Sequence, residues 1–107
     1  MSEFIIIYIT TASSEEAASI GKALVDERIA ACANVLPGMT SIYRWDGKTQ
    51  SGSEAVLILK TRKNLLAKAE IRIKDLHSYD TPCILAIPVI DGSHPFLQWI
   101  EKETSEA

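Results

Sequence analysis

The sequence is short of cysteine, of basic charge and of long apolar runs. Its two cysteines, Cys32 and Cys83, allow at most one disulfide bond, which excludes a disulfide-stabilised scaffold. Neither lies in a CxxC motif, so we expect a reduced protein of the cytoplasm. The net charge of −3 argues against non-specific binding to nucleic acid, which depends on a basic surface.

The apolar run near the N-terminus is too short for a signal peptide or a membrane span. Phe4 to Ile9 make six residues without a preceding basic segment, whereas both of those segments need a longer apolar core. These residues are mostly β-branched or aromatic, and the run stops at Thr10 and Thr11. The pattern predicts a buried β-strand, and we expect no membrane partner.

Motifs typical of common enzyme classes are missing as well. The sequence has no GxSxG, HExxH, Walker loop or dinucleotide-binding fingerprint. Its acidic residues are scattered over expected helices and termini, where solvation explains them. We therefore predict that the protein is not an enzyme. One enzymatic hypothesis stays open on residue type alone, in which Cys83 is a nucleophile and His77 is its base.

What the sequence does contain is enough apolar residues for one core. It has 107 residues, of which 47% are hydrophobic, so we expect a single domain over residues 1–107. Ser13 and Glu16 fit a capping box, and apolar residues at helical spacing then predict a helix to about Ala31. Gly21 inside this helix costs roughly 1 kcal/mol relative to alanine, which predicts a close approach of a neighbouring element.

A hairpin is expected in the middle of the chain. The Pro-Gly pair at 37–38 predicts a turn after the first helix. Residues 40–61 then have the pattern of two strands, and the hairpin tip falls either at the Asp-Gly pair 46–47 or at 51–53. Residues 55–59 are continuously apolar, which is typical of a strand buried on both faces.

The last third of the chain predicts a helix, a strand and a second, shorter helix. The pattern favours a helix over residues 61–76 and a strand over residues 83–90. Pro88 lacks an N–H group, so one side of that strand is expected to be a sheet edge. Ser93 is expected to cap the C-terminal helix, and residues 101–107 to form a solvated tail.

The resulting order, β-α-β-β-α-β with an extra C-terminal helix, is that of a ferredoxin-like α+β sandwich. Helices would cover one face of the sheet. The strands are too apolar for the other face to lie in water. We therefore expect a homo-oligomer that packs its sheets together.

Three residues carry side chains that suit a soft metal ion. Imidazole and thiolate groups are good ligands for copper and zinc, which makes Cys32, His77 and Cys83 candidate metal ligands. Structural roles are the alternatives, since free cysteine is often buried and a histidine after a helix is favoured by the helix dipole. His77 and Cys83 alone are only two ligands, which is one or two fewer than a tight closed site needs, so subunits would have to share a site.

A second candidate site is aromatic. Tyr43 and Trp45 share one face of the expected hairpin because they are two residues apart. Either a neighbouring subunit covers them, or they line a pocket with Lys60. The two interpretations are compatible if the pocket lies between subunits.

Several motifs together resemble the CutA divalent-cation tolerance family, from Ile5 to Ile100. They are ERIAACANVLPGMTSIYRWDGK at 27–48, EAVLILKT at 54–61, HSYDTPCILAIPV at 77–89 and FLQWI at 96–100. The resemblance implies a ferredoxin-like homotrimer, similar in architecture to PII signalling proteins. Its long hairpin would reach across to neighbouring subunits, extend their sheets and close their edges.

The resemblance also implies which residues gather at a cleft between subunits. Carried over position by position, they are Cys32, Tyr43, Trp45, Glu54, Lys60, His77, Tyr79 and Pro82. The family name implies a role in tolerance to divalent metals, with copper most often mentioned. We expect copper or another divalent cation to bind weakly, and no tightly held cofactor.

The chain departs from the family pattern at two positions. Cys83 stands where the family usually has an acidic residue, so a carboxylate is replaced by a soft thiol. Leu76 stands where some members carry a further histidine. We therefore predict a non-enzymatic, metal-tolerance trimer with a weak soft-donor site. The alternative is a PII-like signalling or small-molecule sensor trimer, in which Lys60 and the aromatic residues bind an anionic ligand.

Overall fold

The protein folds around a four-stranded antiparallel sheet of strand order β2-β3-β1-β4. The computed structural model describes residues 3–105. The elements in chain order are β1 (Phe4–Thr11), α1 (Ser14–Asp26), β2 (Cys32–Trp45), β3 (Lys48–Arg62), a 3₁₀ turn η1 (Lys63–Leu65), α2 (Leu66–Leu76), β4 (Ile84–Val89) and α3 (His94–Glu103). This order is the predicted α+β arrangement with its extra C-terminal helix.

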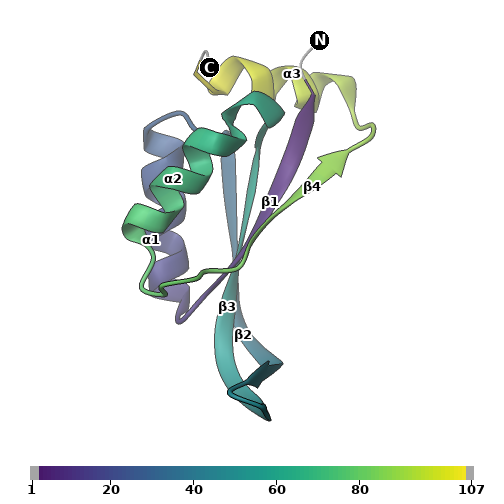
Figure 1. Ribbon diagram of the computed structural model, residues 1–107. Coiled ribbons are helices and arrows are strands. Elements are labelled where there is room, and N and C mark those ends of the chain that lie inside the picture. Colours follow the sequence, from purple (N-terminus) through teal and green to yellow (C-terminus); the bar gives the residue numbers. More distant parts are fainter. Residues whose placement is uncertain (1–2, 106–107) are drawn as a thin grey trace.

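The main core lies between one face of the sheet and two helices. Helices α1 and α2 cover one face (Figure 1), and alternate residues of β1 point into the core between helices and sheet. Ile7 and Ile9 are fully buried there, and burying such a side chain stabilises a fold by roughly 1.5–3 kcal/mol. The core also contains Ile5, Ala17, Ile20, Leu24, Ile29, Ala30, Ala55, Leu57, Leu59, Ala69 and Ile73.

Gly21 lies where α1 comes closest to the sheet, as its cost to the helix predicted. A Cβ atom added to Gly21 would lie 2.9 Å from the Cβ of Ala33 on β2 and 3.1 Å from Cδ1 of Leu57 on β3. The missing side chain therefore sets the distance between helix and sheet.

The first helix is shorter than predicted. It ends at Asp26, because Arg28 adopts a left-handed conformation with φ of 61° and the N–H of Ile29 donates to the Leu24 carbonyl. Cys32 is therefore the first residue of β2 and not the end of a helix. The Pro-Gly pair at 37–38 makes a bulge within that strand, where the register with β3 shifts, and not the predicted turn.

The second helix also begins later than predicted. Residues 61 and 62 still belong to β3, because they pair with Ile5 and Phe4 of β1. Thr61 is fully buried and donates from Oγ1 to the Ile29 carbonyl at 2.5 Å. The backbone then makes η1 and enters α2 only at Leu66.

The prediction of a solvated tail over residues 101–107 was wrong for residues 101–103, which form the last turn of α3, and for Thr104, which is anchored to the domain. This residue is 4% exposed, and its hydroxyl accepts a hydrogen bond of 2.8 Å from Nε of Arg62. The Arg62 guanidinium also donates to the carbonyl of Ser105, whose own N–H donates to the Arg28 carbonyl. Residues 106 and 107 of the predicted tail lie outside the described residues.

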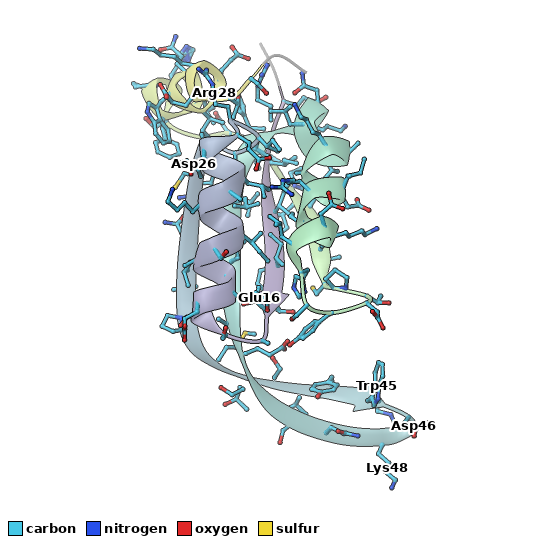
Figure 2. All side chains as sticks on the ribbon, turned by 90° about the vertical axis from the view of Figure 1, so that its left-hand side faces the viewer. Glu16, Asp26, Arg28, Trp45, Asp46 and Lys48 are labelled. Carbon is cyan, nitrogen blue, oxygen red and sulfur yellow. The ribbon has the colours of Figure 1, made fainter. Side chains whose placement is uncertain are left out.

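The ends of the sheet differ. Strand β4 is an edge strand, as Pro88 predicted. Beyond the bulge at 37–38, β2 and β3 continue as a two-stranded hairpin, which curves away from the rest of the domain (Figures 1 and 2). Asp46 and Gly47 form its tip with positive φ, which decides between the two predicted positions. The molecule is accordingly elongated, at 45 × 25 × 22 Å.

Candidate functional site

His77 occupies a junction at the end of the domain from which the hairpin leaves. Its side chain is fully buried, and its Nε2 lies 2.8 Å from the Thr10 carbonyl. Its Nδ1 accepts a hydrogen bond of 3.0 Å from the N–H of Tyr79. Since Nδ1 accepts this hydrogen bond, Nε2 carries a proton and donates to the Thr10 carbonyl. The ring therefore ties the end of α2 to the end of β1.

Glu16, in the first turn of α1, makes hydrogen bonds at the same junction. The Ser13 hydroxyl accepts from the Glu16 N–H at 3.1 Å, as the capping box predicted, but the Glu16 carboxylate accepts from Ala12 at 3.0 Å and not from Ser13. Its second oxygen accepts from the N–H of Ser78 at 2.7 Å and lies 3.9 Å from Nδ1 of His77. Burial alone would raise the pKa of this carboxyl, but the N–H donors of Ala12 and Ser78 outweigh burial and lower it.

Glu16→Gln should therefore destabilise the protein at neutral pH by about 1 kcal/mol, the usual value of a lost cap. Because the folded pKa is lowered, the carboxylate contributes its stability above the ordinary pKa of about 4.3 and loses it as the pH falls through the folded pKa. The gap between wild type and variant should close on acidification in urea unfolding curves. Glu15→Gln, an exposed change in the same helical turn, is the matched control. A gap that is unchanged by acidification would contradict the assignment.

Tyr79 and Glu54 form the polar contact nearest to the hairpin. The Tyr79 hydroxyl donates to Oε2 of Glu54 at 2.8 Å, and the Tyr79 ring centre lies 4.8 Å from that of His77. Burial, and then the hydrogen bond to Glu54, raise the pKa of Tyr79 to about 12. The loop after α2 is thus joined to β3 where Glu54 pairs with Met39, just past the bulge.

The predicted aromatic residues lie farther out on the hairpin. Tyr43 pairs with Gln50 and is 45% exposed, and Trp45 pairs with Lys48 beside the tip and is 68% exposed. Figure 2 shows Trp45 and Asp46 at the far end of the hairpin, away from Glu16 and the helices. Within one subunit, Trp45 therefore adds nothing to the Tyr79–Glu54 contact.

Lys60 belongs to the other end of the same strand. It is six residues from Glu54 on β3, which corresponds to about 20 Å at 3.3 Å per residue. Its ammonium group lies 5.6 Å from the ring centre of Phe96 on α3. A single subunit thus brings Tyr79 and Glu54 together but keeps Lys60 apart from them.

The predicted metal ligands are also dispersed. Cys32 pairs with Lys60 across β2 and β3, and its thiol lies 3.6 Å from Oδ1 of Asn34. Cys83 immediately precedes β4, and both cysteines are free. Among residues 3–105, no three His, Cys, Asp or Glu side chains are grouped so that they could hold a metal ion. His77 would have to give up a backbone contact to become a ligand, so its metal role stays a prediction.

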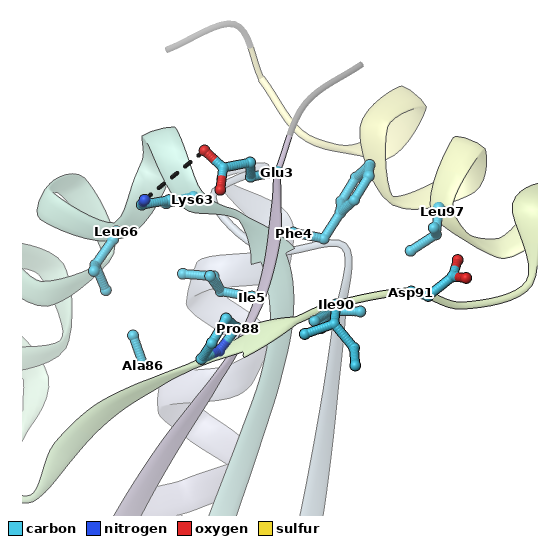
Figure 3. Close-up of a pocket in the computed structure, with 11 residues that line it drawn as sticks. Glu3, Phe4, Ile5, Lys63, Leu66, Ala86, Pro88, Ile90, Asp91 and Leu97 are labelled. Atoms are coloured by element: carbon cyan, nitrogen blue, oxygen red, sulfur yellow. Dashed lines mark ion pairs between the residues drawn. The ribbon is translucent and has the colours of Figure 1, made fainter.

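A hollow lies against the start of β1 (Figure 3), and none of the predicted site residues lines it. It has a volume of about 620 Å³. Its walls are mostly apolar, and Lys63 and Glu3 form an exposed ion pair of 3.8 Å at its rim. Its lining residues are Glu3, Phe4, Ile5, Lys63, Leu66, Ala86, Pro88, Val89, Ile90, Asp91 and Leu97.

Sequence reasoning gave Glu16 a capping role only and missed its bond to Ser78. The two residues are 62 positions apart, and nothing in the local pattern of either segment indicates the contact. The burial of His77 was missed for the same reason, since its partner Thr10 is 67 positions away.

Comparison with known proteins gives one consistent match. The family model described as "CutA1 divalent ion tolerance protein" matches residues 5–103. The divalent-cation tolerance protein CutA of Thermus thermophilus is 43% identical over 99 residues, which cover 92% of this chain and 96% of that protein. The chloroplastic protein CutA of Arabidopsis thaliana is 39% identical over 94% of this chain, which spans only 55% of that longer protein.

The fold agrees with the sequence comparison. The crystal structure of CutA1 from Oryza sativa superposes with a TM-score of 0.96 at 35% identity, covering 99% of this chain and 97% of that one. At this level of identity and coverage, the sequence motifs and the three-dimensional structure point to the same family.

Proposed function

The chain belongs to the CutA1 divalent ion tolerance family, and from this premise we propose that it acts in tolerance to divalent metal ions as a non-enzymatic homotrimer. The observation that carries the proposal is the family match over residues 5–103, which includes the hairpin and both sheet edges. Copper is the ion we propose, bound weakly in a cleft between subunits.

The exposed apolar surface supports assembly. The open sheet face and the hairpin carry large apolar side chains that a monomer leaves in water, and exposed apolar surface of this kind favours an interaction with another chain. An isolated two-stranded hairpin is also only marginally stable, so contact with another subunit would stabilise it. The exposed residues are Leu36, Ile42, Tyr43, Trp45, Leu85 and Ile87.

We propose that the cleft forms around the Tyr79–Glu54 contact. Tyr43 lies on the neighbouring part of the same hairpin, and Trp45 would come from the hairpin of another subunit. Cys32 and Cys83 supply soft donors, and three subunits would supply three copies of each. His77 fixes the loop that carries Tyr79, so its first role in this cleft is to position that residue.

No catalytic role is proposed. The imidazole of His77 has both nitrogens engaged by backbone groups, which argues against its acting as a base for Cys83.

None of the helices described over residues 3–105 is long and apolar enough to cross a membrane. We propose the cytoplasm as the compartment because both cysteines are free, although the Arabidopsis relative is named as chloroplastic.

Native mass spectrometry of the reduced protein, with and without one equivalent of copper per chain, tests this function. We expect a trimer that gains whole numbers of copper ions, and fewer in Cys32→Ser and Cys83→Ser than in wild type. Zinc, which has no redox chemistry, is the comparison that separates binding from oxidation of the thiols. A trimer that binds neither metal at micromolar concentration would remove direct metal binding, and a monomer would remove the intersubunit cleft.

A further inference from the structure

A second, smaller cavity lies between α3 and the end of the sheet opposite the hairpin. Its volume is about 200 Å³. Helix α3 crosses this end of the sheet (Figure 1), and Phe4, Ala31 and Ile100 form a small core beside the cavity. The lining residues are Ile5, Ile6, Lys60, Val89, Gly92, Ser93, Phe96, Leu97 and Ile100.

Lys60 is the one charged residue in this lining, and the structure gives it no anionic partner. Its ammonium group lies 5.6 Å from the Phe96 ring centre, and within residues 3–105 it makes no ion pair. Its neighbours across the strands are Ile6 and Cys32. No carboxylate lines the cavity in the part of the chain that the structure describes. A partly buried cation among apolar groups favours the arrival of an anion.

The other polar groups around the cavity also suit an anion. Ser93 occupies the N-cap position of α3, but its side chain makes no capping hydrogen bond, contrary to the sequence prediction. The first turn of a helix presents N–H groups and the positive end of the helix dipole. Ser93 and Phe96 line the cavity, so the positive end of the α3 dipole lies beside it.

The size and charge of the cavity limit the ligand. A volume of about 200 Å³ is below the roughly 300–1,000 Å³ of sites for drug-sized ligands, so the ligand is small. One lysine balances one negative charge, and walls of isoleucine, valine, leucine and phenylalanine favour an apolar body. These features favour a singly charged carboxylate over a nucleotide, which carries several charges and a polar sugar.

We propose that this cavity binds a small monocarboxylate with a compact apolar body, such as a short aliphatic or single-ring acid. The carboxylate pairs with the Lys60 ammonium, and the apolar body packs between Ile6 and Phe96. One subunit supplies all of the lining, so the site is separate from the metal cleft. Ile6 pairs with both Lys60 and Ile87, so the cavity borders the open sheet face on which we propose that subunits assemble. The cavity lies about 20 Å along β3 from Glu54 and is a separate site.

Titration calorimetry of the intact reduced protein with benzoate and hexanoate tests the proposal. Benzyl alcohol has the ring without the charge, and acetate has the charge without the body; both should bind at least about ten-fold more weakly than benzoate. Lys60→Met should weaken benzoate binding about ten-fold or more, since a hydrogen bond to a charged group is lost. Lys60→Arg should retain binding, and Lys63→Met, at the rim of the hollow in Figure 3, should bind as wild type does.

Three results would overturn the proposal. They are no benzoate binding at millimolar concentration, equal benzoate affinity of wild type and Lys60→Met, or a loss of affinity in Lys63→Met as large as that in Lys60→Met. Because Lys60 lies on a central strand, circular dichroism must first show that each variant is folded. If Lys60→Met does not fold, an NMR measurement on wild type replaces it, in which magnetisation transfer from the Phe96 ring to the benzoate ring shows whether benzoate binds in this cavity. The presence of this transfer supports the site, and its absence rejects it.

Discussion

Replacing His77 by alanine should lower the free energy of unfolding by about 2–5 kcal/mol, the largest effect on stability that we expect from the site. The buried imidazole satisfies the Thr10 carbonyl with one nitrogen and the Tyr79 N–H with the other. Alanine leaves both backbone groups unsatisfied, at about 1–3 kcal/mol each, and leaves a cavity as well. Urea unfolding at a fixed protein concentration measures the change, since the stability of an oligomer depends on concentration.

Two comparison variants separate hydrogen bonding from other effects of the His77 change. Ser78→Ala removes a hydroxyl that also hydrogen-bonds to the Glu16 carboxylate but keeps the Ser78 N–H that donates to it, so it should cost only about 1 kcal/mol. His77→Asn can still accept from Tyr79 through its amide oxygen and should lie between the two. If His77→Ala were as stable as Ser78→Ala, the junction would not hold the loop as we describe.

Trp45→Ala should weaken association of the subunits by roughly 30-fold or more, as expected for an interface residue that dominates binding. Trp45 is 68% exposed in one subunit, beside the tip of a hairpin that pairs with no third strand among residues 3–105. An aromatic residue in this position gains the most when another copy covers it. Sedimentation over a dilution series measures the change, together with the loss of trimer.

The control for Trp45 is Glu103→Ala in α3, a change outside the hairpin and the open sheet face. Trp45→Phe, which keeps an aromatic ring, should restore much of the association. If Trp45→Ala and Glu103→Ala were equally trimeric at every dilution, the hairpin tip would not contribute to the interface.

The hairpin shows how sequence reasoning succeeded and failed within one element. The Asp-Gly pair at 46–47 was one of two predicted tips, and positive φ at both residues confirmed it. The Pro-Gly pair at 37–38 has the same kind of local signal, but it forms a bulge inside a continuous strand. Residues on both sides of this pair find partners on β3, and those ladder hydrogen bonds outweigh the local preference for a turn.

Helix ends show the same competition. Periodicity alone would extend α1 towards Ala31, but Ile29 and Ala30 are buried in the core and Ala31 donates to the Lys60 carbonyl. The chain must leave the helix earlier to reach the sheet. Arg28 allows this by adopting a positive φ, which no sequence pattern indicated.

The sequence by itself determined the order of strands and helices along the chain, the capping of α1 by Ser13 and the edge position of β4, because each depends on residues close together in the chain. It also determined the family, through motifs spread over nearly the whole chain. Only the tertiary structure decided that the buried His77 ring contacts the Thr10 carbonyl and that Glu16 accepts a hydrogen bond from the loop after α2. It also decided that Lys60 lies near Phe96 and far from Glu54. Each of these contacts joins segments whose separation along the chain carries no local signal. The hydrogen bonds and burial that fix them exist only once the sheet has brought its strands and helices together.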